Sequence, residues 1–302
     1  MSANPPANLP VNLPGNPPGN LPGDPPGSPP ANALESSAIA LDGVRIAFDD
    51  REVLRGVSFS VAPRETLVLL GETGTGKTLL LKMIAGLLRP DAGTIRVLGH
   101  DVTAMREPEL LPFRRRLGFV FQESALFDSL TVADNVAYRL HEEGVDDDEI
   151  EARVDESLRF VEMEGAKDKL PGDLSGGMRR RVSIARALIT NPPIVLYDSP
   201  TAGLDPVTAQ TIITLILRLR DVYGVTSVLA TQRIQDAFAL ANFRFAPETN
   251  RVFRVTGNGN APAPGHAPRT RFLFLREGSV YFEGDQDAVA HSKDAFLERF
   301  LV

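Results

Sequence analysis

Short apolar segments recur along the chain and predict its strands. Residues 39–48 and 53–61 alternate apolar and polar positions, which is typical of half-buried antiparallel strands. Short apolar runs bounded by polar or glycine residues predict further strands, some of them fully buried. These runs lie at 66–70, 94–98, 118–122, 194–197, 227–230, 272–275 and 280–283, the last two around the turn Glu277-Gly278.

Helical spacing of apolar positions occurs between these strands. The predicted helices cover 77–87, 107–115, 132–142, 205–222 and 294–300, and a further one begins after Ser175. Apolar strands that alternate with helices are typical of βαβ units in a parallel sheet. The pattern therefore predicts an α/β fold with a parallel-sheet core and an antiparallel part near its beginning.

Two segments fall outside this pattern. Residues 1–36 are rich in Pro, Asn and Gly, and 11 of the 24 prolines lie between Pro5 and Pro30, so we expect a disordered, partly polyproline II tail. The alternative is a proline-rich ligand for a partner protein. Residues 248–269 are rich in Gly, Pro and Asn and predict an inserted loop. The predicted folded domain covers residues 37–302.

Composition narrows the classes of function. The net charge of −7 disfavours a duplex nucleic-acid binder, so no nucleic acid is expected as a partner. The chain has no cysteine, which excludes a disulfide scaffold and a thiolate metal site. No apolar run approaches the roughly 20 residues needed to cross a bilayer. Nine acids between Glu142 and Glu156 indicate a cation site or, as we favour, a solvated helix with Asp146, Asp147 and Asp148 at its positive end.

A glycine-rich turn between a predicted strand and a predicted helix carries the clearest chemical signal. It matches the phosphate-binding P-loop pattern through Gly71, Glu72, Thr73, Gly74, Thr75, Gly76, Lys77 and Thr78. Glycines let successive backbone N–H groups point at phosphate, and the start of the helix adds partial positive charge. In this pattern Lys77 reaches the β- and γ-phosphates, and the Thr78 hydroxyl ligates Mg²⁺. ATP and Mg²⁺ are therefore the expected cofactors.

Two more features follow the P-loop. The turn Ser175-Gly176-Gly177 begins a helix, for which Ser175 is a good N-cap. Asp198 closes the apolar strand 194–197. An acid at the end of a strand after a P-loop is the group that orients Mg²⁺ through its ligand shell, so Asp198 and Thr78 are both expected at the metal.

The order of these motifs resembles the ATP-binding domain of ABC transporters over residues 37–302. The resemblance implies a P-loop NTPase (RecA-like) fold with a parallel-sheet core, an antiparallel β subdomain and a helical signature subdomain at about 123–180. It places Leu174–Gly177 in the signature motif. The other implied roles belong to Phe48 for adenine stacking, Gln122 in the Q-loop as a catalytic residue and metal ligand, Asp198 as the Walker B acid, and Asp205 in the D-loop as part of the catalytic set.

The resemblance also implies how such a domain works. It predicts a head-to-tail homodimer or heterodimer, with ATP between the P-loop of one subunit and residues 175–177 of the other. ATP would then join the subunits, and hydrolysis would release them. The implied partner is an integral-membrane permease, which places the chain on the cytoplasmic face of the inner (plasma) membrane.

A narrower resemblance concerns residues 121–136. The stretch Phe121-Gln-Glu-Ser-Ala-Leu-Phe127 is similar to the Q-loop of ATPases from Mce/Mla-type lipid transporters, although Glu123 replaces a small residue. Such systems imply transport of lipids or phospholipids, with a small regulatory subunit and a periplasmic lipid-binding subunit. The alternative is the ATPase of an amino-acid-type importer, whose Q-loop region is similar.

Two positions depart from the family pattern. Ser199 stands where a glutamate normally polarises the attacking water, and Gln232 stands where a histidine normally contacts the γ-phosphate. Loss of a general base typically costs about 10²–10⁴ in rate. Three interpretations are open: hydrolysis persists, assisted by Glu123 or by the phosphate itself; the chain is a hydrolysis-impaired partner of a competent subunit; or it is a soluble ABC protein outside transport, which its single cassette argues against.

Overall fold

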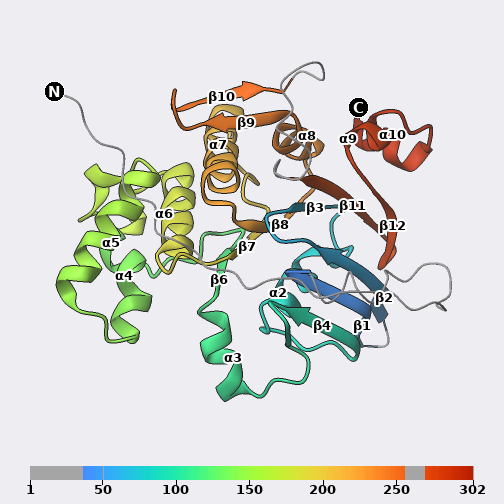
Figure 1. Ribbon diagram of the computed structural model, residues 1–302, viewed down its shortest axis with the longest axis horizontal. Helices are drawn as coiled ribbons and strands as arrows, with labels where there is room; N and C mark the ends of the chain where they lie inside the picture. The colour runs from blue at the N-terminus through green and yellow to red at the C-terminus, as the bar shows by residue number, and fades with distance from the viewer. Residues whose placement is uncertain (1–36, 50, 256–268, 302) are drawn as a thin grey trace, which may run out of the picture.

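A six-stranded sheet forms the centre of the molecule in the computed structural model, which describes residues 37–49, 51–255 and 269–301 (Figure 1). Five of its strands run parallel, and β12 pairs antiparallel with β11 at one edge. The predicted parallel core is confirmed. In spatial order the strands are β12 (Ser279–Gly284), β11 (Thr270–Arg276), β3 (Thr66–Leu70), β8 (Thr226–Thr231), β7 (Ile194–Asp198) and β6 (Leu117–Val120).

A second, antiparallel sheet lies beside the first, at the lower right of Figure 1. This confirms the antiparallel part that the alternating pattern predicted, although its second strand begins two residues earlier than expected. Its strands, in spatial order, are β2 (Arg51–Val61), β1 (Ile39–Phe48), β4 (Ala92–Val97) and β5 (His100–Asp101).

Helices flank both sheets, and α4, α5 and α6 lie together at the left of Figure 1, where α6 packs against β6 and α7. Within the described residues, no helix combines the length and apolar character needed to cross a bilayer. The α-helices are α2 (Lys77–Ile84), α3 (Glu107–Arg114), α4 (Val132–Glu142), α5 (Asp147–Phe160), α6 (Gly176–Leu188), α7 (Pro206–Tyr223), α8 (Ile234–Asn242), α9 (Gln286–Ala290) and α10 (Ala295–Leu301), with single 3₁₀ turns at Glu164–Ala166 and Pro171–Asp173.

Two predicted boundaries differ from the structure for identifiable reasons. Helix α2 ends before the predicted residue 87, because Gly86 takes a left-handed conformation (φ 65°) that stops the helix. The segment 248–269 is not a loop from its start, since β10 (Arg251–Arg254) pairs with β9 (Phe243–Ala246) as a hairpin. The rest of that segment, 256–268, and the predicted tail 1–36 lie outside the described residues.

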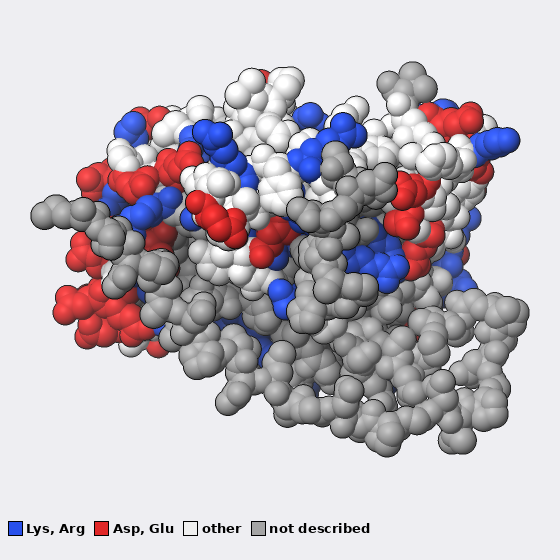
Figure 2. Space-filling view, turned by 45° about the horizontal axis from the view of Figure 1, so that its top comes forward, with Lys and Arg blue, Asp and Glu red and all other residues white. Residues whose placement is uncertain are grey.

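The acidic segment forms a solvated helix end. Asp146 caps α5 by accepting a hydrogen bond from the Asp148 amide at 3.1 Å. In the described part of the chain, no group of three or more His, Cys, Asp or Glu side chains could hold a metal ion. Figure 2 shows acidic side chains gathered at the end of the molecule where α4 and α5 lie. The structure therefore agrees with the helix interpretation.

Two hydrophobic cores lie on opposite faces of the central sheet. On β3, Leu67 and Leu69 join the core under the antiparallel sheet and α2. Val68 and Leu70 join the core under α6, α7 and α8. Because side chains alternate across a strand, this fully buried strand packs on both faces, and its carboxyl end lies between the two layers.

A buried arginine joins the helical layer to the sheet. Arg220 of α7 is 0% exposed and pairs with Asp221 at 2.7 Å. Its guanidinium also donates to the carbonyl oxygens of Leu240 and Phe243 and to the Thr270 hydroxyl. The Asp221 carboxylate in turn accepts from the Phe245 amide at 2.7 Å. One ion pair thus connects α7, α8, β9 and β11.

This connection predicts a large stability effect. Asp221→Asn removes the charge that compensates buried Arg220, so we expect it to lower the free energy of unfolding by about 3 kcal/mol. Urea unfolding followed by circular dichroism measures the change. The matched control is Asp155→Asn, which breaks an exposed pair with Lys167 (2.8 Å) and should cost less than about 1 kcal/mol. Equal effects of the two variants would contradict the assignment.

Candidate nucleotide-binding site

Residues 71–76 of the P-loop form the turn between β3 and α2, and Lys77 and Thr78 begin that helix, as predicted. Gly71 and Gly76 have φ values of 151° and 97°, which side-chain-bearing residues rarely adopt. A Cβ atom at Gly71 would lie 2.6 Å from the carbonyl oxygen of Leu275, and one at Gly76 would lie 2.4 Å from Leu54 Cδ2. Glycine is therefore required at both ends of the loop, because β11 presses on one end and β2 on the other.

The Lys77 ammonium lies inside this loop. Its Nζ donates to the carbonyl oxygens of Gly71 (2.8 Å) and Glu72 (2.7 Å). Burial lowers the pKa of Lys77 to about 8, and the charge of Asp198 partly opposes that change. A desolvated cation beside a helix N-terminus fits a polyphosphate anion, which would replace the lost hydration.

Thr78 and Asp198 meet at the same edge of the sheet. The Thr78 hydroxyl donates to Asp198 Oδ1 at 3.1 Å, and Asp198 is buried at the end of β7. They meet because the carboxyl ends of the parallel strands β3 and β7 share one edge, with β8 between them. A hydroxyl and a carboxylate are oxygen donors of the kind that Mg²⁺ prefers, so the pair fits that ion.

The two departures from the family pattern lie at this edge as well. The Ser199 hydroxyl donates to Asp198 Oδ1 at 3.4 Å, and its backbone is left-handed with φ 49°. Gln232 follows β8 and accepts a hydrogen bond from the Thr73 hydroxyl at 3.2 Å. Residues 199 and 232 therefore lie beside the P-loop. This agrees with their positions in the sequence, directly after the strands β7 and β8.

Asp236 is a buried acid at this edge that no sequence motif indicated. It is 3% exposed and accepts from the hydroxyls of Thr201 and Thr231, so it connects the segment after Ser199 with the segment before Gln232. Burial raises its pKa. The available signal was an acid among the apolar positions of α8, a helix that was not predicted.

The Q-loop residues follow the neighbouring strand β6. Gln122 and Glu123 are both exposed. The Phe121 carbonyl, just before them, accepts a hydrogen bond from buried Arg180 of α6. The charges of Asp198 and Glu123 both act on Arg180, so the Q-loop and the end of β7 face a common region.

The signature turn and the D-loop each begin a helix. Ser175 caps α6 by accepting from the Met178 amide (3.3 Å), and Asp205 caps α7 by accepting from the amides of Val207 and Thr208 (both 3.0 Å). Hydrogen bonds from Thr208 lower the pKa of Asp205. A Cβ atom at Gly177 would lie 2.3 Å from Thr208 Cγ2, so the signature turn and the D-loop pack on each other. A Cβ atom at Gly176 would lie 3.7 Å from Leu204 Cδ2, which is ordinary van der Waals contact. Among the described residues, no hydrogen bond joins these two turns to the P-loop.

Phe48 remains an exposed aromatic at the end of β1. Its side chain is 47% exposed, and its strand pairs with the β2 segment that places Leu54 against Gly76. Ile46, two residues before Phe48 on β1, is the strand partner of Leu54.

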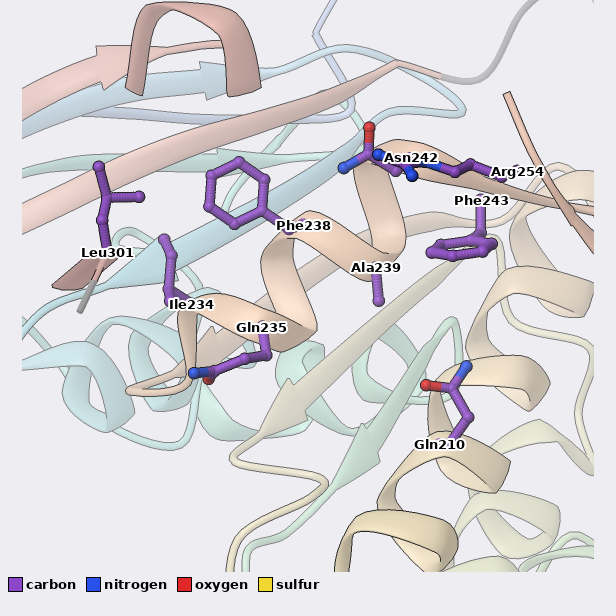
Figure 3. A pocket seen from close by; sticks show the side chains of 9 residues that line it. All are labelled: Gln210, Ile234, Gln235, Phe238, Ala239, Asn242, Phe243, Arg254 and Leu301. Atoms are coloured by element: carbon purple, nitrogen blue, oxygen red, sulfur yellow. The ribbon is translucent and has the colours of Figure 1, made fainter. Parts of the chain in front are cut away.

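A separate hollow of about 500 Å³ lies between α7, α8 and the chain end (Figure 3). Phe238 and Gln235 of α8 face it, and Leu301 and Gln210 border it from either side. Its lining contains no P-loop residue, so it is distinct from the nucleotide site.

Together the fold and the site define a P-loop ATP-binding cassette. The ABC transporter family model matches residues 54–202. The sulfate/thiosulfate import ATP-binding protein CysA of Caulobacter vibrioides is 38% identical over 239 residues, which are 78% of this chain and 68% of that protein. The chain belongs to the ABC transporter family, whose ATP-binding proteins are P-loop ATPases.

Other similar proteins agree with this assignment. The methionine import ATP-binding protein MetN of Brucella abortus is 35% identical over 236 residues, or 76% of this chain, and the match spans 64% of MetN. The dimeric ATP-binding cassette MJ0796, bound to ADP and Pi in a post-hydrolysis state, superposes with a TM-score of 0.68 at 28% identity, covering 82% of this chain and 98% of that one. The structure of cbiO1 from Clostridium perfringens superposes with a TM-score of 0.70 at 25% identity, covering 88% of this chain and 96% of that one.

Lys77 leads to a pH-dependent prediction for ATP binding. Because its pKa in the free protein is about 8, while a bound polyphosphate would favour the charged form, binding above that pH requires proton uptake. We expect the affinity for fluorescent ATP to hold up to about pH 8 and then to fall, by at most about tenfold per pH unit.

Two variants make this titration decisive. Lys77→Ala removes the ammonium and should abolish binding, whereas Lys82→Ala, on the same helix, should titrate like the wild type. Unchanged affinity in Lys77→Ala would refute the site.

Proposed function

We propose that the chain binds MgATP at this P-loop and drives a membrane importer of the amino-acid type. The observation that carries ATP binding is the desolvated Lys77 ammonium inside the loop, next to the Thr78–Asp198 pair. The importer class is supported by MetN and CysA, whose names describe methionine and sulfate/thiosulfate import. None of these relatives is named for lipids, so they favour the amino-acid alternative over the Mce/Mla-type lipid transporter.

Each part of the site would have one task. The loop from Gly71 to Gly76 and the start of α2 would hold the phosphates, with Lys77 on the β- and γ-groups. Thr78, Asp198 and Gln122 would hold Mg²⁺, which shields the phosphate charge. Phe48 would stack on adenine.

The second half of the ATP site would come from another subunit. Ser175–Gly177 begins the 13-residue helix α6 but makes no hydrogen bond to the P-loop of its own chain among the described residues. A head-to-tail dimer would bring this helix N-terminus to the γ-phosphate, with Asp205 at the same interface. Either a second copy of this chain or a related ATPase subunit satisfies that requirement.

The permease is proposed to dock beside the Q-loop, on the cytoplasmic face of the membrane. Phe127 and Tyr138 are 43% and 42% exposed, and their rings pack together at 4.6 Å. Phe127 follows the Q-loop by five residues, so a partner helix seated here would sense Q-loop movement. The small regulatory subunit and the periplasmic lipid-binding subunit belong to the lipid interpretation and are not part of this proposal.

The docking proposal predicts a specific crosslink. In cells that produce the chain with a photo-crosslinking phenylalanine analogue in place of Phe127, irradiation should join it to an integral-membrane protein. The same analogue in place of Phe253, which is 51% exposed on β10, is the control and should give no such adduct. Equal adducts at both positions, or none at Phe127, would contradict the docking site.

We propose that ATP hydrolysis persists but is slow. Neither the Ser199 hydroxyl nor the Gln232 amide can accept a proton near neutral pH, so they do not replace the glutamate and the histidine. The same observation supports a second candidate function, a hydrolysis-impaired subunit whose ATP holds a dimer with a competent partner.

The missing groups predict a gain of function. Ser199→Glu with Gln232→His should raise kcat by up to about 10²-fold, because both groups act mainly on the transition state. ATP affinity should change little. Steady-state phosphate release measures the rate, with Ser199→Gln as the control that adds bulk without a carboxylate.

Other outcomes would favour the alternatives. If the double variant is no faster and Glu123→Gln abolishes turnover, then a relocated carboxylate already positions the water. If every variant is inactive alone but active with a second ATPase subunit, the hydrolysis-impaired function holds.

A further inference from the structure

Two arginines of α6 hold the Q-loop from both sides. The Arg180 guanidinium donates to the carbonyl of Phe121, just before Gln122. Arg186 donates to the carbonyls of Ser124 (2.9 Å) and Ala125 (2.7 Å), just after Glu123. The backbone of the two exposed Q-loop residues is therefore fixed at each end by one helix.

The segment 121–125, which the two arginines hold, has a strained backbone. Ser124 and Ala125 have φ values of 64° and 47°, in the left-handed region that side-chain-bearing residues disfavour. The Ser124 amide closes the turn by donating to the Phe121 carbonyl at 3.0 Å. Such a conformation persists only where its surroundings hold it, and here the two arginines contribute to that restraint.

Arg180 is buried with an incomplete set of hydrogen bonds. It is 4% exposed, yet its Nε has no hydrogen-bond partner within the described ranges. Burial lowers the pKa of Arg180, while the negative charges of Asp198 and Glu123 oppose that shift. A neutral side chain could fill this space without the cost of removing a guanidinium from water. The presence of a buried charge at position 180 therefore suggests a role beyond packing.

We propose that Arg180 is a positioning residue that sets Gln122 relative to Asp198 and thereby connects the signature helix to the metal side of the ATP site. The hydrogen bond to Phe121 fixes the backbone that carries Gln122. The Arg180 charge attracts the carboxylates of Asp198 and Glu123. This inference rests on the proposed function, in which Gln122 and Asp198 hold Mg²⁺.

The geometry has a direct consequence for coupling. Helix α6 begins at the signature turn and, one turn later, carries Arg180. A shift of this helix on dimer formation would therefore move the signature turn and the Q-loop together. The Mg²⁺ dependence of ATP binding is the quantity that such a connection should affect.

The test compares the affinity for fluorescent ATP in EDTA and in excess Mg²⁺, using the full chain. Arg180→Met should reduce the Mg²⁺-dependent gain at least about fivefold while leaving the affinity in EDTA nearly unchanged. Arg180→Lys, which keeps the charge and a donor, should recover part of the gain. Arg181→Met is the matched control on the same helix, because Arg181 donates to the carbonyls of Val161 and Glu162 instead.

A double-mutant cycle separates positioning from general stability. If Arg180 acts through Gln122, then Arg180→Met should have no further effect on the Mg²⁺-dependent gain in a Gln122→Ala background. Additive effects, or an equal loss in Arg181→Met, would overturn the inference. Should Arg180→Met not fold, Arg180→Lys and Arg180→Gln in the same cycle decide the question. A wild-type chain that binds ATP without any Mg²⁺ effect would overturn this inference but leave the P-loop intact, whereas a chain that binds no ATP would overturn the proposed function as well.

Discussion

The candidate site depends on one constraint, the confinement of the Lys77 ammonium within a loop of backbone carbonyls. The loop can close around that side chain because Gly71 lies against the Leu275 carbonyl and Gly76 lies against Leu54. These two contacts come from different sheets, so the P-loop is shaped by both layers of the molecule. The cation is desolvated there, and the neighbouring carboxylate of Asp198 offsets part of that cost.

The other groups reach the site because parallel strands end at a shared edge. β3, β8 and β7 are neighbours in the sheet, and they deliver Lys77, Gln232 and Asp198 respectively. Asp236 then ties the loops after β7 and β8 to each other through two threonine hydroxyls. The sheet edge thus holds the charged groups Lys77 and Asp198 in place. Ser199 and Gln232 stand where the family pattern has a glutamate and a histidine, so two groups that could accept a proton are missing while the strands that carry these positions are retained.

Local sequence patterns predicted the strands and the P-loop well, because both depend on short-range features. Leu67 to Leu70 could be assigned to a buried strand from its apolar character, and the glycines marked the turn that follows. The hairpin of β9 and β10 was missed, since its short strands are stabilised by pairing with each other and carry little pattern of their own. Asp236 and Arg180 were missed as site residues for a related reason. Their importance lies in burial and in contacts 5 to 59 residues away in sequence, which no motif records.

The pairing of β3 also determines when the nucleotide site can exist during synthesis of the chain. Thr66 on this strand pairs with Ser227 on one side and with Thr270 on the other. Both neighbours leave the ribosome after the P-loop does, because they lie far downstream in the sequence, and contacts of such large sequence separation form late. A nascent chain therefore carries its phosphate-binding loop unshaped until the closing strand β11 arrives. The phosphate-binding loop is thus completed only when strands from three distant parts of the sequence have paired.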